Sequence, residues 1–247
     1  MPEPVNFSER RANTVWQVIE TRSHVVMRDQ RLDENLSPLV RHLDDITDTV
    51  CEALLVERDE MELKTHVWVY HPDVLRVPGA SVRTQNHKTF YGTADAAGVH
   101  LVADHLAWDT PLVLDRVLHE VVHGIWGSLV GEAPSLLNEG IAAWMERQYT
   151  HEPHPRLLEL DHGWKQAQRS GPGWLAPLMV NDGFWSAHAD GLDVYAVGAF
   201  LTRAIVDRYG LETLAAIFRD TVYEDAHLAN ILQQHLGTSL ADLEALG

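Results

Sequence analysis

The sequence predicts an α+β fold, in which a small N-terminal mixed sheet lobe precedes a mostly helical C-terminal lobe. Residues 64–70 alternate as a half-buried strand does, and residues 99–102 show a second strand pattern. Apolar residues recur at helical spacing across residues 38–56. Helical patterns dominate the chain after residue 128. Strands concentrated in one half and helices in the other are typical of the α+β class.

In the N-terminal half we expect a loose segment over residues 1–20 and an α/β lobe over residues 21–127. Residues 15–20 and 24–27 suggest a short helix or strand leading into a first β-strand. Residues 94–98 contain the turn formers Asp and Gly between strand-like runs, which predicts a hairpin turn.

We expect a helical lobe over residues 128–247. Residues 150–192 are rich in Pro and Gly, which predicts a long irregular connection with one short helix near residues 155–168. Three closing helices are expected at residues 193–208, 211–222 and 226–236.

A helix beginning at Pro111, with Asp109 or Thr110 as its N-cap, carries the motif H-E-x-x-H. His119 and His123 are four residues apart, so both imidazoles project from one side of the helix and can reach one ion. Glu120 lies beside that ion. Two histidines and a carboxylate are typical ligands of a catalytic Zn²⁺, and a nearby carboxylate can take a proton from water.

The third metal ligand is expected to be Glu139. It follows Asn138 and precedes Gly140 near the start of a second helical run, residues 135–145. Residues 124–138 are long enough to end the first helix and return a second helix past the metal. The predicted set is therefore His119, His123 and Glu139 as ligands, with Glu120 as general base.

These motifs resemble those of the gluzincin zinc metallopeptidases, in which H-E-x-x-H is followed on the next helix by a glutamate in N-E-G. Tyr195 and Gly198 also match the Y-x-x-G helix of that family. The resemblance implies a thermolysin-like catalytic core, peptide-bond hydrolysis, and a Tyr195 hydroxyl that hydrogen-bonds the oxyanion. His188 is a second candidate donor, because it precedes Tyr195 in a loop rich in Gly and Asp.

The chain departs from the family at two places. The thermolysin branch has an Asp where this chain has Ala143, so another residue must orient the histidines. The aminopeptidase branch has a G-x-M-E-N strand whose glutamate holds the substrate amine, and this chain offers only Asp95 in the comparable position. We therefore expect an endopeptidase, with Val99–Val102 as a sheet-edge strand that binds an extended peptide.

The formal net charge of −17 argues against nucleic-acid binding and mildly favours cationic peptide or protein substrates. The sequence contains no apolar run long enough to span a membrane and no secretory signal, which predicts a cytoplasmic protein. The lone Cys51 excludes an internal disulfide. The sequence does not predict an oligomeric state.

Two alternatives remain at this stage. Two histidines and one carboxylate are also the ligand set of non-haem iron enzymes. A non-catalytic, metal-stabilised binding scaffold is the other, although Glu120 and Tyr195 are not needed for a structural metal.

Overall fold

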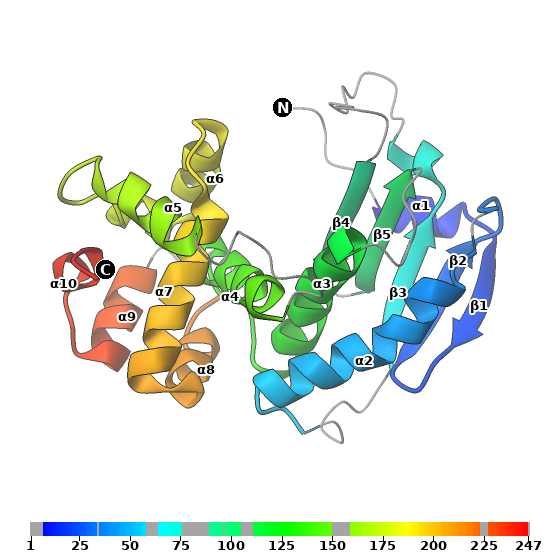
Figure 1. Ribbon diagram of the computed structural model, residues 1–247, viewed down its shortest axis with the longest axis horizontal. Helices are drawn as coiled ribbons and strands as arrows, with labels where there is room; N and C mark the ends of the chain where they lie inside the picture. Colours follow the sequence, from blue (N-terminus) through cyan, green and yellow to red (C-terminus); the bar gives the residue numbers. More distant parts are fainter. Residues whose placement is uncertain are drawn as a thin grey trace. The chain divides into compact units, whose positions relative to one another are not determined.

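The computed structural model describes residues 7–33, 35–57, 64–75, 89–95, 97–104, 111–149, 159–222 and 227–246. It confirms the α+β class, with a small mixed sheet in the N-terminal half and helices in the C-terminal half (Figure 1). The chain divides into two compact units, Met1–Ile125 and Trp126–Gly247. We describe each unit by itself.

The first unit is built on a five-stranded sheet of order β1-β2-β3-β5-β4. Its strands are β1 (Trp16–Glu20), β2 (His24–Asp29), β3 (Thr65–Tyr70), β4 (Thr89–Asp95) and β5 (Gly98–Asp104). The pairs β2–β3 and β3–β5 are parallel, whereas β1–β2 and β4–β5 are antiparallel. Asp95 pairs with Gly98 across the predicted hairpin, and Gly98 has φ of 120°, a conformation that suits glycine.

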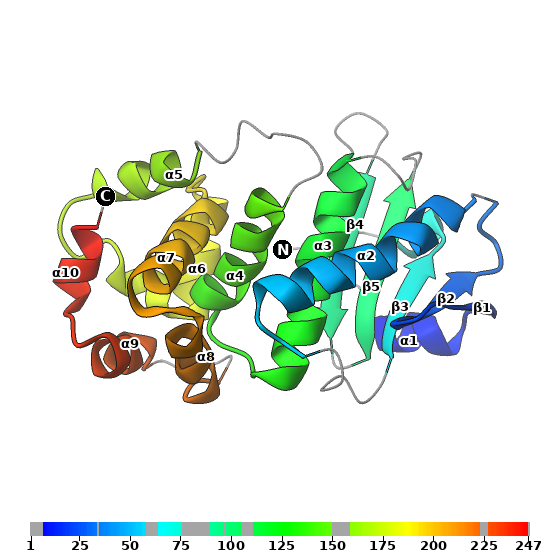
Figure 2. The ribbon, with the colours of Figure 1, turned by 60° about the horizontal axis from the view of Figure 1, so that its bottom comes forward.

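Helices cover both faces of this sheet. The longer helices α2 (Ser37–Ala53) and α3 (Pro111–Leu129) lie on one face, as Figure 2 shows. A Cβ at Gly124 of α3 would be 3.6 Å from a methyl group of Val99. The next residue, His100, points to the opposite face, where its ring stacks on Phe7 of α1 (Phe7–Ala12) at 4.8 Å. This alternation along β5 follows the two-residue period of a strand.

The expected loose segment, residues 1–20, instead contains α1 and β1. Phe7 is only 7% exposed, and Trp16 packs edge-on against Trp68 and Tyr70 of β3 at 5.0 and 5.2 Å. These aromatic contacts stabilise a segment whose local pattern is polar. The order of this segment depends on partners about fifty to ninety residues away in the sequence, which a local pattern does not reveal.

The expectation that Val99–Val102 is an edge strand is wrong. This stretch belongs to β5, which pairs with β3 on one side and β4 on the other. All four of its residues are essentially fully buried, including His100. Burial on both faces is typical of an interior strand. Among the described strands the edge on this side of the sheet is β4, and the backbone of Val99–Val102 is paired on both sides, so it offers no free edge to a peptide.

The second unit is helical. Its elements are α4 (Ser135–Gln148), α5 (Glu159–Gln168), η4 (Ala176–Met179), α6 (Asn181–Ala189), α7 (Val194–Tyr209), α8 (Leu211–Arg219), α9 (Leu228–Leu236) and α10 (Leu240–Glu244). The three predicted closing helices correspond to α7, α8 and α9. The connection expected to be irregular is more helical than predicted, because α6 and η4 lie within it.

The core of the second unit is the pair α4–α7. A Cβ added to Gly140 of α4 would lie 2.6 Å from the carbonyl oxygen of Gly198 of α7 and 2.8 Å from Thr202 Oγ1. A Cβ added to Gly198 would lie 2.9 Å from Gly140 Cα. Both positions therefore need glycine, because the two backbones approach too closely for any side chain.

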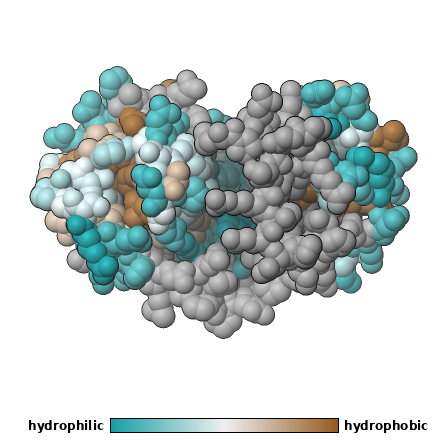
Figure 3. Space-filling model, turned by 90° about the horizontal axis from the view of Figure 1, so that it is seen from above, coloured by the Kyte–Doolittle hydropathy of each residue, from teal (hydrophilic) through white to brown (hydrophobic). Residues whose placement is uncertain are grey.

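Among the described residues, no helix combines the length and apolar character that crossing a bilayer requires. The described surface in Figure 3 is largely hydrophilic, with hydrophobic residues in smaller groups.

Candidate metal centre

Helix α3 carries the H-E-x-x-H motif, and its apolar side chains bury it. Leu118, Val121 and Ile125 are no more than 1% exposed. The helix begins at Pro111 as predicted, while the proposed caps Asp109 and Thr110 lie outside the described residues. Since the apolar side chains pack inward, the histidines project from an adjoining face of the same helix. His119 is 4% exposed, and His123 is half-buried.

The two imidazoles converge. Their ring centroids are 5.0 Å apart with the rings at 74°, and the Nε2 atoms are 3.3 Å apart. Two nitrogen ligands at about 2.0–2.1 Å from a tetrahedrally coordinated Zn²⁺ lie about 3.3 Å from each other. The spacing of the Nε2 atoms therefore suits two ligands of one ion, and it follows from the four-residue spacing on a single helix.

Glu139 lies in the first turns of α4 and is half-buried. One ligand atom from each of His119, His123 and Glu139 lies within 4.8 Å of the others, so this group could hold a metal ion. The chain from Pro111 to Tyr149 is described without a gap, and residues 130–134 connect the two helices. Two imidazoles and one carboxylate are the donor types that zinc prefers.

Glu120 is 7% exposed and lies against the edge strand of the sheet in the first unit. A Cβ added to Gly92 of β4 would be 2.8 Å from both Cγ and Oε1 of Glu120. The side chain of Glu120 therefore occupies space that only a glycine leaves open. Sequence reasoning missed this role of Gly92, although a glycine inside a strand often marks a close approach.

Tyr195 lies in the first turn of α7 and is half-buried. The helix begins at an N-cap, Asp193, whose side chain accepts a hydrogen bond from the Ala196 amide at 3.0 Å. Three aromatic rings of α6 surround Tyr195: Phe184 at 6.1 Å, Trp185 at 6.4 Å and His188 at 5.6 Å between centroids.

The structure thus brings His188 beside Tyr195, whereas the sequence placed the two only in the same loop. Trp185 is a further neighbour that sequence reasoning did not assign to the site. It is 37% exposed. Of the two departures from the gluzincin pattern, Ala143 is 2% exposed within α4, and Asp95 ends β4 at the hairpin.

The chain matches no protein-family model and no curated protein. Among solved structures, it is similar to the crystal structure of an aminopeptidase N family protein from Idiomarina loihiensis. The TM-score is 0.52 at 12% sequence identity, and the similarity covers 93% of this chain and 46% of that one. The chain thus spans about half the length of that protein. At this level of identity the similarity concerns the fold.

Proposed function

We propose that this protein is a zinc-dependent peptidase of the gluzincin type. The main support is the His119, His123 and Glu139 group, whose ligand atoms lie within 4.8 Å of one another beside the motif glutamate. The similarity in fold to an aminopeptidase N family protein agrees with this assignment. A metal-stabilised scaffold would not need Tyr195 or Glu120, whereas a non-haem iron enzyme uses the same donor types and is distinguished by the metal bound.

The donor set fits zinc, since it combines two imidazoles with one carboxylate. His119, His123 and Glu139 would hold the ion. When bound, zinc polarises a substrate carbonyl and lowers the pKa of a water at its open position.

Glu120 serves as general base in this proposal. Its carboxylate accepts a proton from water and passes it to the leaving amine. Burial at 7% exposure and the close approach of Gly92 hold the side chain in one place. Tyr195 donates its hydroxyl proton in a hydrogen bond to the oxyanion, and His188 is the alternative donor. A single donor of this kind contributes about 2.7–4 kcal/mol to lowering the barrier.

We propose endopeptidase action, with β4 replacing Val99–Val102 as the strand that binds an extended peptide. Strand β4 is the sheet edge among the strands that the structure describes, and it passes Glu120 at Gly92. An edge backbone can pair with a peptide on both sides of the cut bond. The sequence of β4 contains one carboxylate, Asp95, which pairs with Gly98 at the hairpin. The acidic character of the chain favours cationic peptides as substrates.

Metal content and turnover test the site together. We expect His119→Ala and Glu139→Ala to leave purified protein with far less than one zinc per chain. Glu120→Gln should keep its zinc and lose activity. Matched controls are His162→Ala and Glu132→Gln, which change exposed residues outside the group. A Glu120→Gln variant with undiminished turnover contradicts the mechanism, and iron in place of zinc supports the alternative metalloenzyme.

Peptides with free and acetylated N-termini separate endopeptidase from aminopeptidase action. We expect blocked peptides to be cut at internal bonds at least as well as free ones, as read by mass spectrometry. Release of single N-terminal residues, abolished by blocking, would instead support an aminopeptidase. In that case Asp95→Asn tests whether Asp95 holds the substrate amine.

A further inference from the structure

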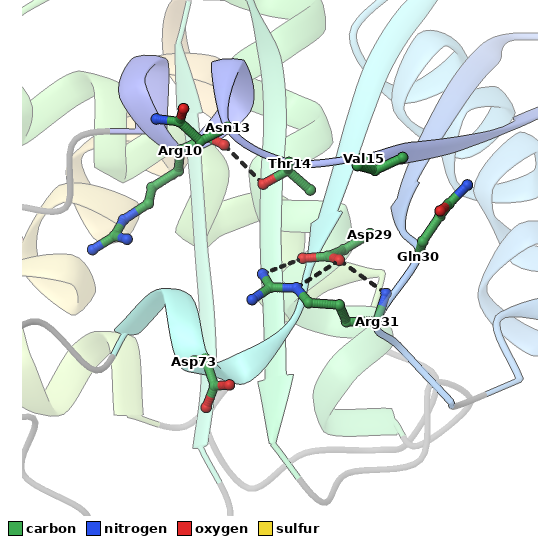
Figure 4. A pocket seen from close by; sticks show the side chains of 8 residues that line it. All are labelled: Arg10, Asn13, Thr14, Val15, Asp29, Gln30, Arg31 and Asp73. Atoms are coloured by element: carbon green, nitrogen blue, oxygen red, sulfur yellow. Dashed lines mark hydrogen bonds and ion pairs between the residues drawn. The ribbon is translucent and has the colours of Figure 1, made fainter.

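The first unit contains a pocket of about 330 Å³ that is lined mostly by polar and charged residues and does not include the residues of the metal group. Figure 4 shows the eight residues that line it: Arg10, Asn13, Thr14, Val15, Asp29, Gln30, Arg31 and Asp73. They come from α1 and the turn after it, from the end of β2 and its following turn, and from the 3-10 helix η2 (Pro72–Leu75). Three separate segments therefore meet at this pocket.

Arg31 is held in one orientation by Asp29, which is 1% exposed. The Nε of Arg31 donates to Asp29 Oδ1 at 3.0 Å, and Nη2 donates to Oδ2 at 2.6 Å. Asp29 also accepts from the backbone amides of Arg31 at 3.0 Å and His71 at 3.3 Å. A guanidinium fixed by a buried carboxylate loses little further conformational entropy when a ligand binds.

This pairing leaves donors of Arg31 unused. A guanidinium has five N–H donors, and the two-point contact with Asp29 uses one on each of two nitrogens. In Figure 4 the remaining nitrogen points away from Asp29, toward the side of the pocket where Arg10 and Asp73 lie. The hydrogen bond to Asp29 and the charges of Asp29 and Asp73 raise the pKa of Arg31, so its positive charge persists at all physiological pH values.

Arg10 supplies the second guanidinium. It is half-buried on α1, and none of the ion pairs found among the described residues involves it. The chain has 19 basic residues against 36 acidic ones, so two arginines that line one pocket depart from its overall character. The pocket also contains the carboxylate of Asp73, which would repel a bound anion. This side chain is 46% exposed, and its Oδ2 lies 3.3 Å from His71 Nδ1.

We propose that this pocket binds the oxyanion of a small polar organic molecule, a carboxylate or a phosphate, between Arg10 and Arg31. Planar guanidinium groups bind both kinds of oxyanion through paired hydrogen bonds. Arg31 is positioned by Asp29, and Arg10 completes the site from α1. The site is separate from the proposed peptidase function and does not depend on it.

The size and lining of the pocket indicate that the ligand extends beyond the oxyanion. A volume of about 330 Å³ exceeds that of a lone carboxylate or phosphate and lies within the range of small-molecule sites. The rest of the lining is largely polar, with Asn13, Thr14 and Gln30 beside Val15. The hydroxyl of Thr14 donates to the Arg10 carbonyl at 2.8 Å, which leaves its oxygen able to accept from the ligand.

Isothermal titration calorimetry of the full chain with inorganic phosphate and, separately, sodium acetate at low ionic strength tests the proposal. We expect one saturable site for at least one of these anions. Arg10→Gln should weaken binding about tenfold or more, because it removes a charge-assisted contact. Asp73→Asn should tighten binding several-fold, since it removes a repelling carboxylate. The matched control is Arg41→Gln, an exposed arginine on α2 outside the pocket lining.

The two anions and the variants distinguish the outcomes. Tighter binding of phosphate indicates a phosphorylated ligand, and tighter binding of acetate indicates a carboxylate ligand. The proposal is overturned if neither anion binds saturably, or if Arg10→Gln binds as the wild type does. An anion that binds at the metal group instead would bind equally well to Arg10→Gln. The second result therefore detects that case as well. Should Arg10→Gln fold poorly, Asp73→Asn decides, and unchanged or weaker binding in that variant rejects the site.

Discussion

The two units position their proposed site residues with glycines that act in different ways. In the sheet unit, Gly92 leaves room for a side chain, because a Cβ there would lie 2.8 Å from Glu120 Oε1. In the helical unit, Gly140 follows Glu139 and leaves room for a backbone, because a Cβ there would lie 2.6 Å from the Gly198 carbonyl oxygen.

The two glycines should therefore differ in what they affect: Gly92 the position of a side chain, and Gly140 the stability of the fold. A side chain such as Glu120 can rotate away from an added methyl group at small cost to the fold, but it then leaves its place. Two helix backbones in contact cannot adjust so easily, since close-packed interiors relax only in part. A substitution at Gly92 should therefore affect turnover, and one at Gly140 should affect the free energy of unfolding.

Among the variants that test this comparison, the largest effect is expected at Tyr195, which tests whether the helical unit supplies a catalytic hydroxyl in addition to Glu139. Tyr195→Phe removes one hydroxyl and little packing, so kcat should fall on the order of 100-fold or more with KM nearly unchanged. Steady-state kinetics on a peptide substrate measure this change. If turnover is nearly unaffected, the Tyr195 hydroxyl is not the oxyanion donor, and His188→Ala should then carry the loss.

Gly92→Ala tests the sheet unit's half of the comparison. The added methyl group displaces Glu120, and a misplacement of about 1 Å can lower turnover about 100-fold. The melting temperature should change little. Thr93→Ala, at the next residue of the same edge strand, is the control and should retain most activity. If both variants lose the same amount of activity, any substitution in β4 lowers turnover. The specific role of Gly92 would then be rejected.

Gly140→Ala tests the expectation for the helical unit. Overpacking against the backbone of α7 should lower the free energy of unfolding by about 1–3 kcal/mol. For a chain of this size, each kcal/mol corresponds to about 2–4 °C in melting temperature. Calorimetry measures the shift, and residual activity at low temperature shows whether Glu139 is still in place. A stable but inactive variant would contradict the separation of roles.

The smallest effect concerns acid stability in the sheet unit. Burial alone would raise the pKa of Asp44, but hydrogen bonds from Thr21 Oγ1 and the amides of Arg22 and Ser23 lower it below its usual value. A lowered folded-state pKa stabilises the protein above the unfolded pKa of about 3.9, and that contribution is lost as pH falls through the folded value.

Asp44→Asn should therefore lower the free energy of unfolding at pH 7 by roughly 1–2 kcal/mol, and by less near pH 3. Denaturant melts at the two pH values measure the difference. Asp45→Asn, one residue along the same helix and exposed, is the control. If Asp44→Asn lowers the free energy of unfolding by the same amount at both pH values, the ionised carboxylate of Asp44 is not the source of the stabilisation.

The features that depend on short spacing follow from the amino-acid sequence alone. The four-residue interval between His119 and His123 places both imidazoles on one helix face, and their Nε2 atoms are 3.3 Å apart. The sequence likewise predicts α2, α3, α4 and the closing helices, because the spacing of apolar residues that indicates each helix lies within that helix.

Contacts between distant parts of the chain set three further features: which strand forms the sheet edge, that residues 7–20 contain α1 and β1, and which glycines lie against the proposed site residues. Val99–Val102 has the same local pattern whether it is an edge or an interior strand, because strand order is set by hydrogen bonds to β3 and β4. The pocket of Arg10, Arg31 and Asp73 joins segments up to about sixty residues apart. Such contacts have no period along the chain, so they arise only when the sheet and its helices pack.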